Sequence, residues 1–105
     1  MGEVLPLQRA DREPARGLPA QEPLWRELVG AELRAERQAR GERLSDVAER
    51  AGVSTQYLSE VERGLKDPSS EILSAVAGAL DLTVRQLSVR VARSEASYGA
   101  LCLAA

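Results

Sequence analysis

Apolar residues recur along most of the chain at the spacing of an α-helix, in blocks that glycine, proline or serine interrupts. This spacing predicts five helices, over about 24–39, 44–51, 55–63, 70–80 and from 84 onward. Phenylalanine is absent and aromatic residues make up only 3% of the chain. The pattern therefore predicts an all-α domain whose core is built from leucine, valine, isoleucine and alanine.

The stretch AGVSTQYLSEVERG, at 51–64, is the most informative part of the chain. We expect Gly52 to end one helix, Ser54 to cap the next and Gly64 to end it. Helical spacing gives that helix an inward face and a face of small hydrogen-bonding groups: Leu58, Val61 and Glu62 against Thr55, Gln56, Ser59, Glu60 and Arg63. Such a helix is either an amphipathic surface helix or one that enters a groove of DNA.

Composition excludes several function classes. The 105 residues contain no histidine and one cysteine, so a structural zinc site, a histidine-based catalytic site and an internal disulfide are not expected. No nucleophile–base pair is evident, so an enzyme is the least favoured class, and no cofactor, metal or small-molecule ligand is expected. The chain lacks a signal peptide and a membrane-spanning apolar run, which predicts a cytoplasmic protein without membrane contact.

The net charge of −2 argues against unspecific coating of nucleic acid. It leaves room for a sequence-specific reader, because arginine and glutamate alternate along the predicted helices. Binding would then depend on a few positioned cations.

AGVS followed by YLSEVERG resembles the helix-turn-helix of the Cro/C1-type (XRE-family) regulators, and the resemblance extends from about Val29 to Leu87. It implies a five-helix, lambda-repressor-like domain. The apolar period of the last block adds an extended C-terminal helix, which is the least family-like part of the chain. The motifs GxxLxxxRxxxGxRLxxV and YLSEVERGxKxxSSEIL, with an Ala-Ala end, are similar to the Clp-gene regulators of the ClgR/PopR group. Members of that group control clp protease genes and are removed by Clp proteolysis in turn.

The resemblance implies base contacts from Thr55, Gln56 and Glu60 to a double-stranded, inverted-repeat operator. Glutamine can pair with adenine, threonine can touch the thymine methyl group, and glutamate can accept from cytosine N4. We expect the contacts to the DNA backbone from hydroxyl and cationic groups around this helix: Arg43, Ser54, Tyr57, Ser59, Arg63 and Lys66. The family usually has serine or threonine before its second helix and often a phosphate-contacting glutamine at its start, where this chain has Arg43 and Leu44.

Glu62 lies on the inward face of the same helix, and a buried carboxylate requires a cation. In the family the first helix supplies an arginine for this glutamate, at the position of Arg37. We therefore expect a structural ion pair between Arg37 and Glu62.

The chain is expected to divide into an arm (1–22), a helix-turn-helix domain (23–90) and a C-terminal segment (91–105). The arm contains three prolines and is expected to be flexible. Its arginines at positions 9, 12 and 16 could enter a minor groove, but neighbouring acidic residues favour a solvated tail.

Apolar residues at the start of the last helix and beyond it recur near a 3.5-residue period and predict a homodimer interface: Val84, Leu87, Val91, Tyr98 and Leu101. The alternative is a frayed helix that runs into a tail. Leu103, Ala104 and Ala105 resemble the tags that Clp-type proteases recognise; alternatively, Leu101 and Leu103 pack on the dimer.

The sequence thus predicts a DNA-binding transcriptional regulator. One alternative is an antitoxin that represses its own operon and binds a toxin through its arm or tail. Another is an adaptor that never touches DNA.

Overall fold

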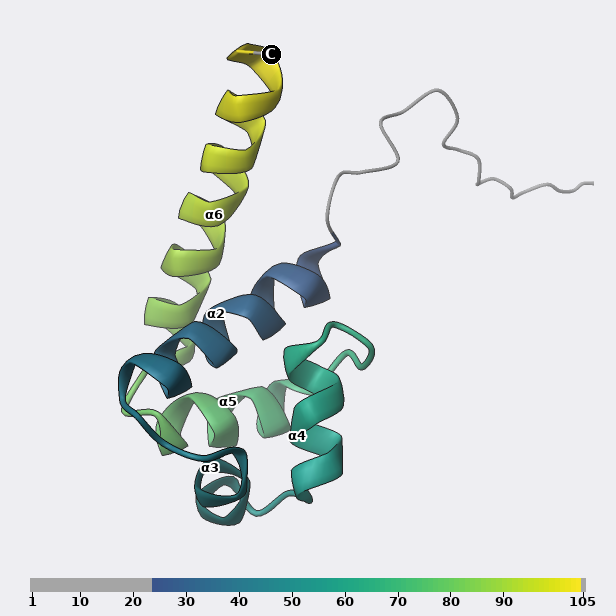
Figure 1. Ribbon diagram of the computed structural model, residues 1–105, viewed down its shortest axis with the longest axis vertical. Helices are drawn as coiled ribbons and strands as arrows, with labels where there is room; N and C mark the ends of the chain where they lie inside the picture. Colours follow the sequence, from purple (N-terminus) through teal and green to yellow (C-terminus); the bar gives the residue numbers. More distant parts are fainter. Residues whose placement is uncertain (1–23, 105) are drawn as a thin grey trace, which may run out of the picture.

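The computed structural model describes residues 24–104, with side chains described as far as Gly99. This part of the chain forms five helices and contains no strand (Figure 1): α2 (Trp25–Ala39), α3 (Leu44–Ala51), α4 (Thr55–Glu62), α5 (Ser70–Ala79) and α6 (Val84–Ala104). The predicted all-α fold is confirmed. The predicted arm over 1–22 and the last residue, Ala105, lie outside the described residues.

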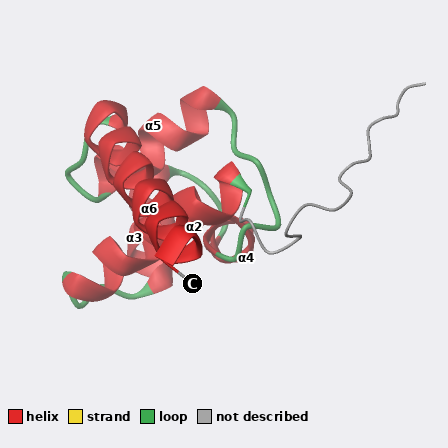
Figure 2. Ribbon diagram, turned by 90° about the horizontal axis from the view of Figure 1, so that it is seen from above, coloured by secondary structure: helices red, strands yellow, loops and turns green. Residues whose placement is uncertain are grey.

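The helices α2 to α5 form a cluster, and α6 begins in it and extends beyond it (Figure 1). Within the cluster α3 packs against both α4 and α5, while α2 packs against α4 and α6. Figure 2 looks down on the molecule and shows α6 crossing over the other helices. α2 is thus the helix that joins the α4 side of the domain to α6.

The core is a single cluster of aliphatic side chains, as the composition predicts. Burying one such side chain contributes about 1.5–3 kcal/mol to stability. α4 is held in this core through its inward face, because Leu58 and Val61 are 0% and 1% exposed. The buried apolar residues come from every helix and from the turn before α6: Val29, Leu33, Val47, Ala48, Leu58, Val61, Val76, Ala77, Leu80, Leu82, Leu87 and Val91.

Three helices begin at a hydroxyl cap. Ser54 Oγ accepts a hydrogen bond from the Tyr57 amide at 3.0 Å, which confirms Ser54 as the cap of α4. Ser69 caps α5 in the same way, at 3.2 Å from the Ile72 amide. Before α6, Thr83 and Gln86 cap each other reciprocally, at 3.0 Å and 2.9 Å.

The helices α2 and α3 begin without a hydroxyl cap. Instead, a carboxylate three residues along the chain accepts from the first backbone amide: Glu27 Oε1 from Leu24 at 2.9 Å, and Asp46 Oδ2 from Arg43 at 3.1 Å. A guanidinium has no acceptor, so Arg43 cannot supply the usual side-chain cap. Asp46 compensates for part of that loss from within the helix.

The predicted dimer interface is wrong at two of its residues. Leu87 and Val91 are 1% and 0% exposed, so the chain's own core already covers both. The periodicity identified an apolar face correctly, but the first turns of α6 bury it within the chain, where α6 packs against α2. Val84 is 37% exposed and Tyr98 is half-buried, whereas the side chain of Leu101 lies outside the described part.

α6 is continuous from Val84 to Ala104, so the expected boundary at 90/91 falls inside a helix. Two polar contacts strengthen its packing on α2: Arg90 Nη1 to Glu36 Oε1 at 2.6 Å and Ser94 Oγ to Glu32 Oε2 at 2.7 Å. Ser94, which interrupts the apolar repeat, thus has a partner on α2.

A group of charged residues ties the loop after α2 to the end of α5. Arg50 Nη2 donates to Glu42 Oε1 at 2.6 Å and to the Ala79 carbonyl at 2.7 Å. Arg40 Nη2 donates to Asp81 Oδ2 at 2.8 Å. The hydrogen bond from Arg50, above all, lowers the pKa of Glu42 from its ordinary value.

Among the described residues, no single helix is both long and apolar enough to cross a membrane. α5 and the first part of α6 reach that length and composition only together, but they meet at 93°. Each helix contributes buried apolar side chains to the core of the domain, Val76 and Ala77 from α5 and Leu87 and Val91 from α6.

Candidate nucleic-acid interface

A tight turn sets α4 at an angle to α3. Gly52 adopts φ +77°, a left-handed conformation that glycine takes without the steric cost of a Cβ. The Val53 amide then donates to the Ala48 carbonyl at 3.0 Å, which closes the end of α3. One residue later, Ser54 caps α4. The turn therefore fixes where α4 begins and in which direction it runs.

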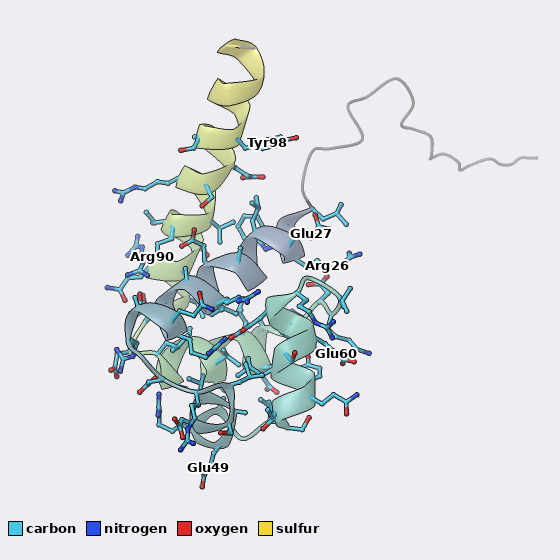
Figure 3. The ribbon with its side chains drawn as sticks, viewed as in Figure 1. Arg26, Glu27, Glu49, Glu60, Arg90 and Tyr98 are labelled. Atoms are coloured by element: carbon cyan, nitrogen blue, oxygen red, sulfur yellow. The ribbon has the colours of Figure 1, made fainter. Side chains whose placement is uncertain are left out.

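The two faces of α4 separate as the spacing predicts. Leu58, Val61 and Glu62 are buried, whereas Thr55 and Gln56 in the first turn are exposed. The rest of the outer face continues with Ser59 and Glu60, which are half-buried, and Arg63, which is exposed. Figure 3 shows Glu60 on the side of α4 that faces away from the other helices.

The outer face can therefore offer an amide, hydroxyls and a carboxylate to a ligand. A helix is narrow enough to enter the major groove of B-DNA, which is about 12 Å wide. Thr55, Gln56 and Glu60, the residues expected to contact bases, all lie on this one face. The side-chain amide of Gln56 makes no hydrogen bond with another described residue, so it is available to a ligand.

Exposed cations precede α3 and follow α4. The Arg43 side chain, before α3, is 85% exposed and lies 3.6 Å from Asp46. Arg63 and Lys66 follow α4, and both are exposed without an ion pair to any described residue. Long, exposed cations of this kind can reach phosphates that pass on either side of an inserted helix.

Two of the three hydroxyl-bearing residues expected at the DNA backbone are tied into the fold. The Ser54 hydroxyl already accepts from a backbone amide, which leaves its proton free to donate. Tyr57 packs partly against the core.

Arg37 and Glu62 form a bidentate ion pair between α2 and the end of α4. Arg37 Nε lies 2.7 Å from Glu62 Oε2, and Nη2 lies 3.0 Å from Oε1. A third nitrogen, Nη1, donates to the Glu42 carbonyl at 3.0 Å. The hydrogen bond to Glu62 raises the pKa of Arg37 above its ordinary value. Glu62 is only 8% exposed, so this carboxylate faces the protein and not the outer surface.

Two further contacts between α2 and the end of α4 were not predicted. Arg26 Nε donates to the Gly64 carbonyl at 2.9 Å. Gly30 is buried against the carbonyls of Val61 and Glu62. A glycine inside a predicted helix can indicate that another backbone packs closely against it. The contact at Gly30 could therefore have been predicted from the sequence. A bond across 38 residues, such as that of Arg26, leaves no such local signal.

A family model described as helix-turn-helix matches residues 33–87 of the chain. The chain is 47% identical over 76 residues to the transcriptional regulator ClgR of Mycobacterium tuberculosis, a match that covers 69% of this chain and 68% of that protein. The crystal structure of the clp gene regulator ClgR from Corynebacterium glutamicum is 45% identical, with a TM-score of 0.72, over 76% of this chain and 85% of that one.

A more distant solved structure has the same fold. It is the restriction-modification controller protein C.AhdI from Aeromonas hydrophila, which is 32% identical with a TM-score of 0.57. The match covers 59% of this chain and 94% of that chain.

Proposed function

Because the chain belongs to the Cro/C1-type (XRE) helix-turn-helix family of transcriptional regulators, a DNA-binding family that is not enzymatic, we propose that it reads an operator with α4 and controls clp protease genes. The observation that carries the proposal is the exposed polar face of a helix whose other face is locked in the core. A rigid helix can hold several side chains in register with base edges at once. We place this regulator in the cytoplasm, with its DNA.

Gln56 is the residue that contributes most to the proposed readout. It is exposed in the first turn of α4, and its side-chain amide can accept from adenine N6 and donate to adenine N7 in a bidentate pair. Thr55, next to Gln56 in the chain, supplies a methyl group that can contact the thymine methyl group. Glu60 lies one turn further along, where its carboxylate accepts from cytosine N4 and repels phosphates and wrong bases.

The proposed phosphate contacts lie around this helix. Arg43, Arg63 and Lys66 supply positive charge, while Ser54, Tyr57 and Ser59 supply hydroxyl groups. Three cations are few for a protein with a net charge of −2, so binding is expected to be weak on random DNA.

Control of clp genes rests on the two ClgR relatives, which match this chain at 47% and 45% identity. The experiment that tests it is a map of genomic binding sites in the host cell, with transcript levels after deletion of the gene. Binding upstream of clp genes and altered clp transcripts are expected. Binding confined to the protein's own operon would contradict the proposal and favour the antitoxin alternative.

We further propose that the protein acts as a homodimer through the part of α6 beyond the core, with Tyr98 and Leu101 on one side of it. Two copies would place two recognition helices about 34 Å apart, one DNA turn, on an inverted repeat. Sedimentation of Leu101→Glu, with Ala96→Glu on the exposed side of α6 as the matched control, tests this. We expect Leu101→Glu to be a monomer and Ala96→Glu to remain a dimer. A dimer in both variants would place the interface elsewhere.

Removal by Clp proteolysis through Leu103, Ala104 and Ala105 belongs to the same proposal. Its support is the resemblance of these small apolar residues to Clp tags, together with the ClgR relatives. Changing Ala104 and Ala105 to aspartate is expected to lengthen the cellular half-life in strains that contain Clp protease. Equal half-lives with and without the protease would contradict it.

A further inference from the structure

α2 holds the C-terminal end of α4 at three points. Arg26 donates to the Gly64 carbonyl, Gly30 lies against the last carbonyls of α4, and Arg37 binds the Glu62 carboxylate. These α2 residues are spaced four and seven apart, so they share one side of the helix. Figure 3 shows Arg26 at the end of α2 that faces the loop after α4. We call this set of three contacts the α2 seat.

Gly30 is the point of closest approach. A Cβ at this position would lie 2.3 Å from the Val61 carbonyl oxygen and 2.6 Å from that of Glu62. Both obstacles are backbone, so no side-chain rotation relieves them. The backbone of Gly30 is ordinary helix, in which glycine is less favourable than alanine. The close approach of α4 is therefore the feature that requires glycine.

We propose that Gly30 and Arg26 are positioning residues that set the tilt of α4 and, through it, the sequence specificity of the proposed DNA binding. This inference rests on the proposed function of α4. Restoring an ordinary 3.4 Å contact to a Cβ at position 30 requires the C-terminal end of α4 to move by about 1 Å. α4 has eight residues and is about 12 Å long, so such a shift tilts it by several degrees.

A small tilt affects the two kinds of DNA contact differently. Hydrogen bonds from Gln56 to a base edge need donor–acceptor distances of about 2.7–3.2 Å and good angles. Lys66 is a flexible, exposed cation that can follow a phosphate. Loss of the α2 seat should therefore reduce specific binding more than unspecific binding.

The test compares Gly30→Ala with Gly78→Ala, which lies in α5 with nothing within 4 Å of its added Cβ. The probes are a duplex that the parent protein selects from a random pool and a scrambled duplex of equal length. We expect Gly30→Ala to lose at least tenfold in affinity for the selected duplex and less than threefold for the scrambled one. Gly78→Ala should match the parent on both duplexes.

A second pair of variants decides the matter if Gly30→Ala does not fold. Arg26→Met removes the bond to the Gly64 carbonyl, and Arg50→Met removes the equivalent bond to the Ala79 carbonyl at the end of α5. That end of α5 lies on the opposite side of the domain from α4 (Figure 1). Only Arg26→Met should lower the ratio of specific to unspecific affinity.

Two results would overturn the inference and separate it from the proposed function. If the parent selects a sequence and the folded seat variants, Arg26→Met included, keep the parent's affinity ratio, the α2 seat does not set specificity. If the parent selects no sequence at all, the proposed reading of DNA is wrong and the inference falls with it.

Discussion

Among single residues, burial separates the structural side chains of α4 from those proposed to read DNA. Glu62 and Glu60 are two residues apart on one short helix, yet Glu62 is buried in an ion pair and Glu60 lies on the outer side. Helical spacing places them on different faces, so the difference was predictable from the sequence. The pairing of Glu62 with Arg37 was predictable only through the family resemblance, because 25 residues separate them.

Arg37→Ala should destabilise the fold by about 3 kcal/mol, since it would leave the Glu62 carboxylate buried and unpaired. Chemical denaturation measures this directly. A double variant, Arg37→Met with Glu62→Leu, should recover much of the loss because no buried charge remains. A stability within about 0.5 kcal/mol of the parent for Arg37→Ala would contradict the buried pair.

At the scale of elements, each helix begins and ends where local chemistry dictates. Ser54, Thr83 and Gly64 act through their nearest neighbours, so the sequence alone predicted the ends of α4 and the start of α6. The partner of an apolar face is a different matter. Leu87 and Val91 were recognised as one face of a helix, but periodicity does not state whether α2 or a second chain covers that face.

The carboxylate of Glu42 links elements in a pH-dependent way. Its pKa is lowered in the folded protein, mainly by the hydrogen bond from Arg50, so the charged form is favoured by folding. The charged carboxylate therefore stabilises the fold at pH values above its ordinary pKa of 4.5. This stabilisation is lost as the pH falls through the lowered pKa.

Glu42→Gln should therefore be less stable than the parent at pH about 6, and the difference should shrink at pH about 3. Urea unfolding of both proteins at the two pH values measures it. Glu49→Gln, at an exposed glutamate of α3, is the matched control. A difference that does not change with pH would mean that the charge of Glu42 contributes nothing to stability.

At the scale of the whole molecule, a compact four-helix cluster presents α4 on one side and extends α6 from another (Figure 1). The overall charge of −2 said little about the outer face of α4, because most acidic residues lie elsewhere or pair with arginines. The all-α class was predictable from five amphipathic blocks, and the arrangement of the helices was predictable through the family resemblance. The α2 seat was not, because it consists of contacts between backbone and residues distant in sequence.

The binding profiles of two variants test whether the outer face of α4 reads base sequence. Gln56→Ala should lose about 1–3 kcal/mol on the selected duplex and relax the preference at one base pair. Lys66→Ala should weaken binding to all sequences alike and lower the salt slope by about one unit. If the profile of Gln56→Ala over a random DNA pool is identical to that of the parent, α4 does not read bases through this residue and the account is contradicted.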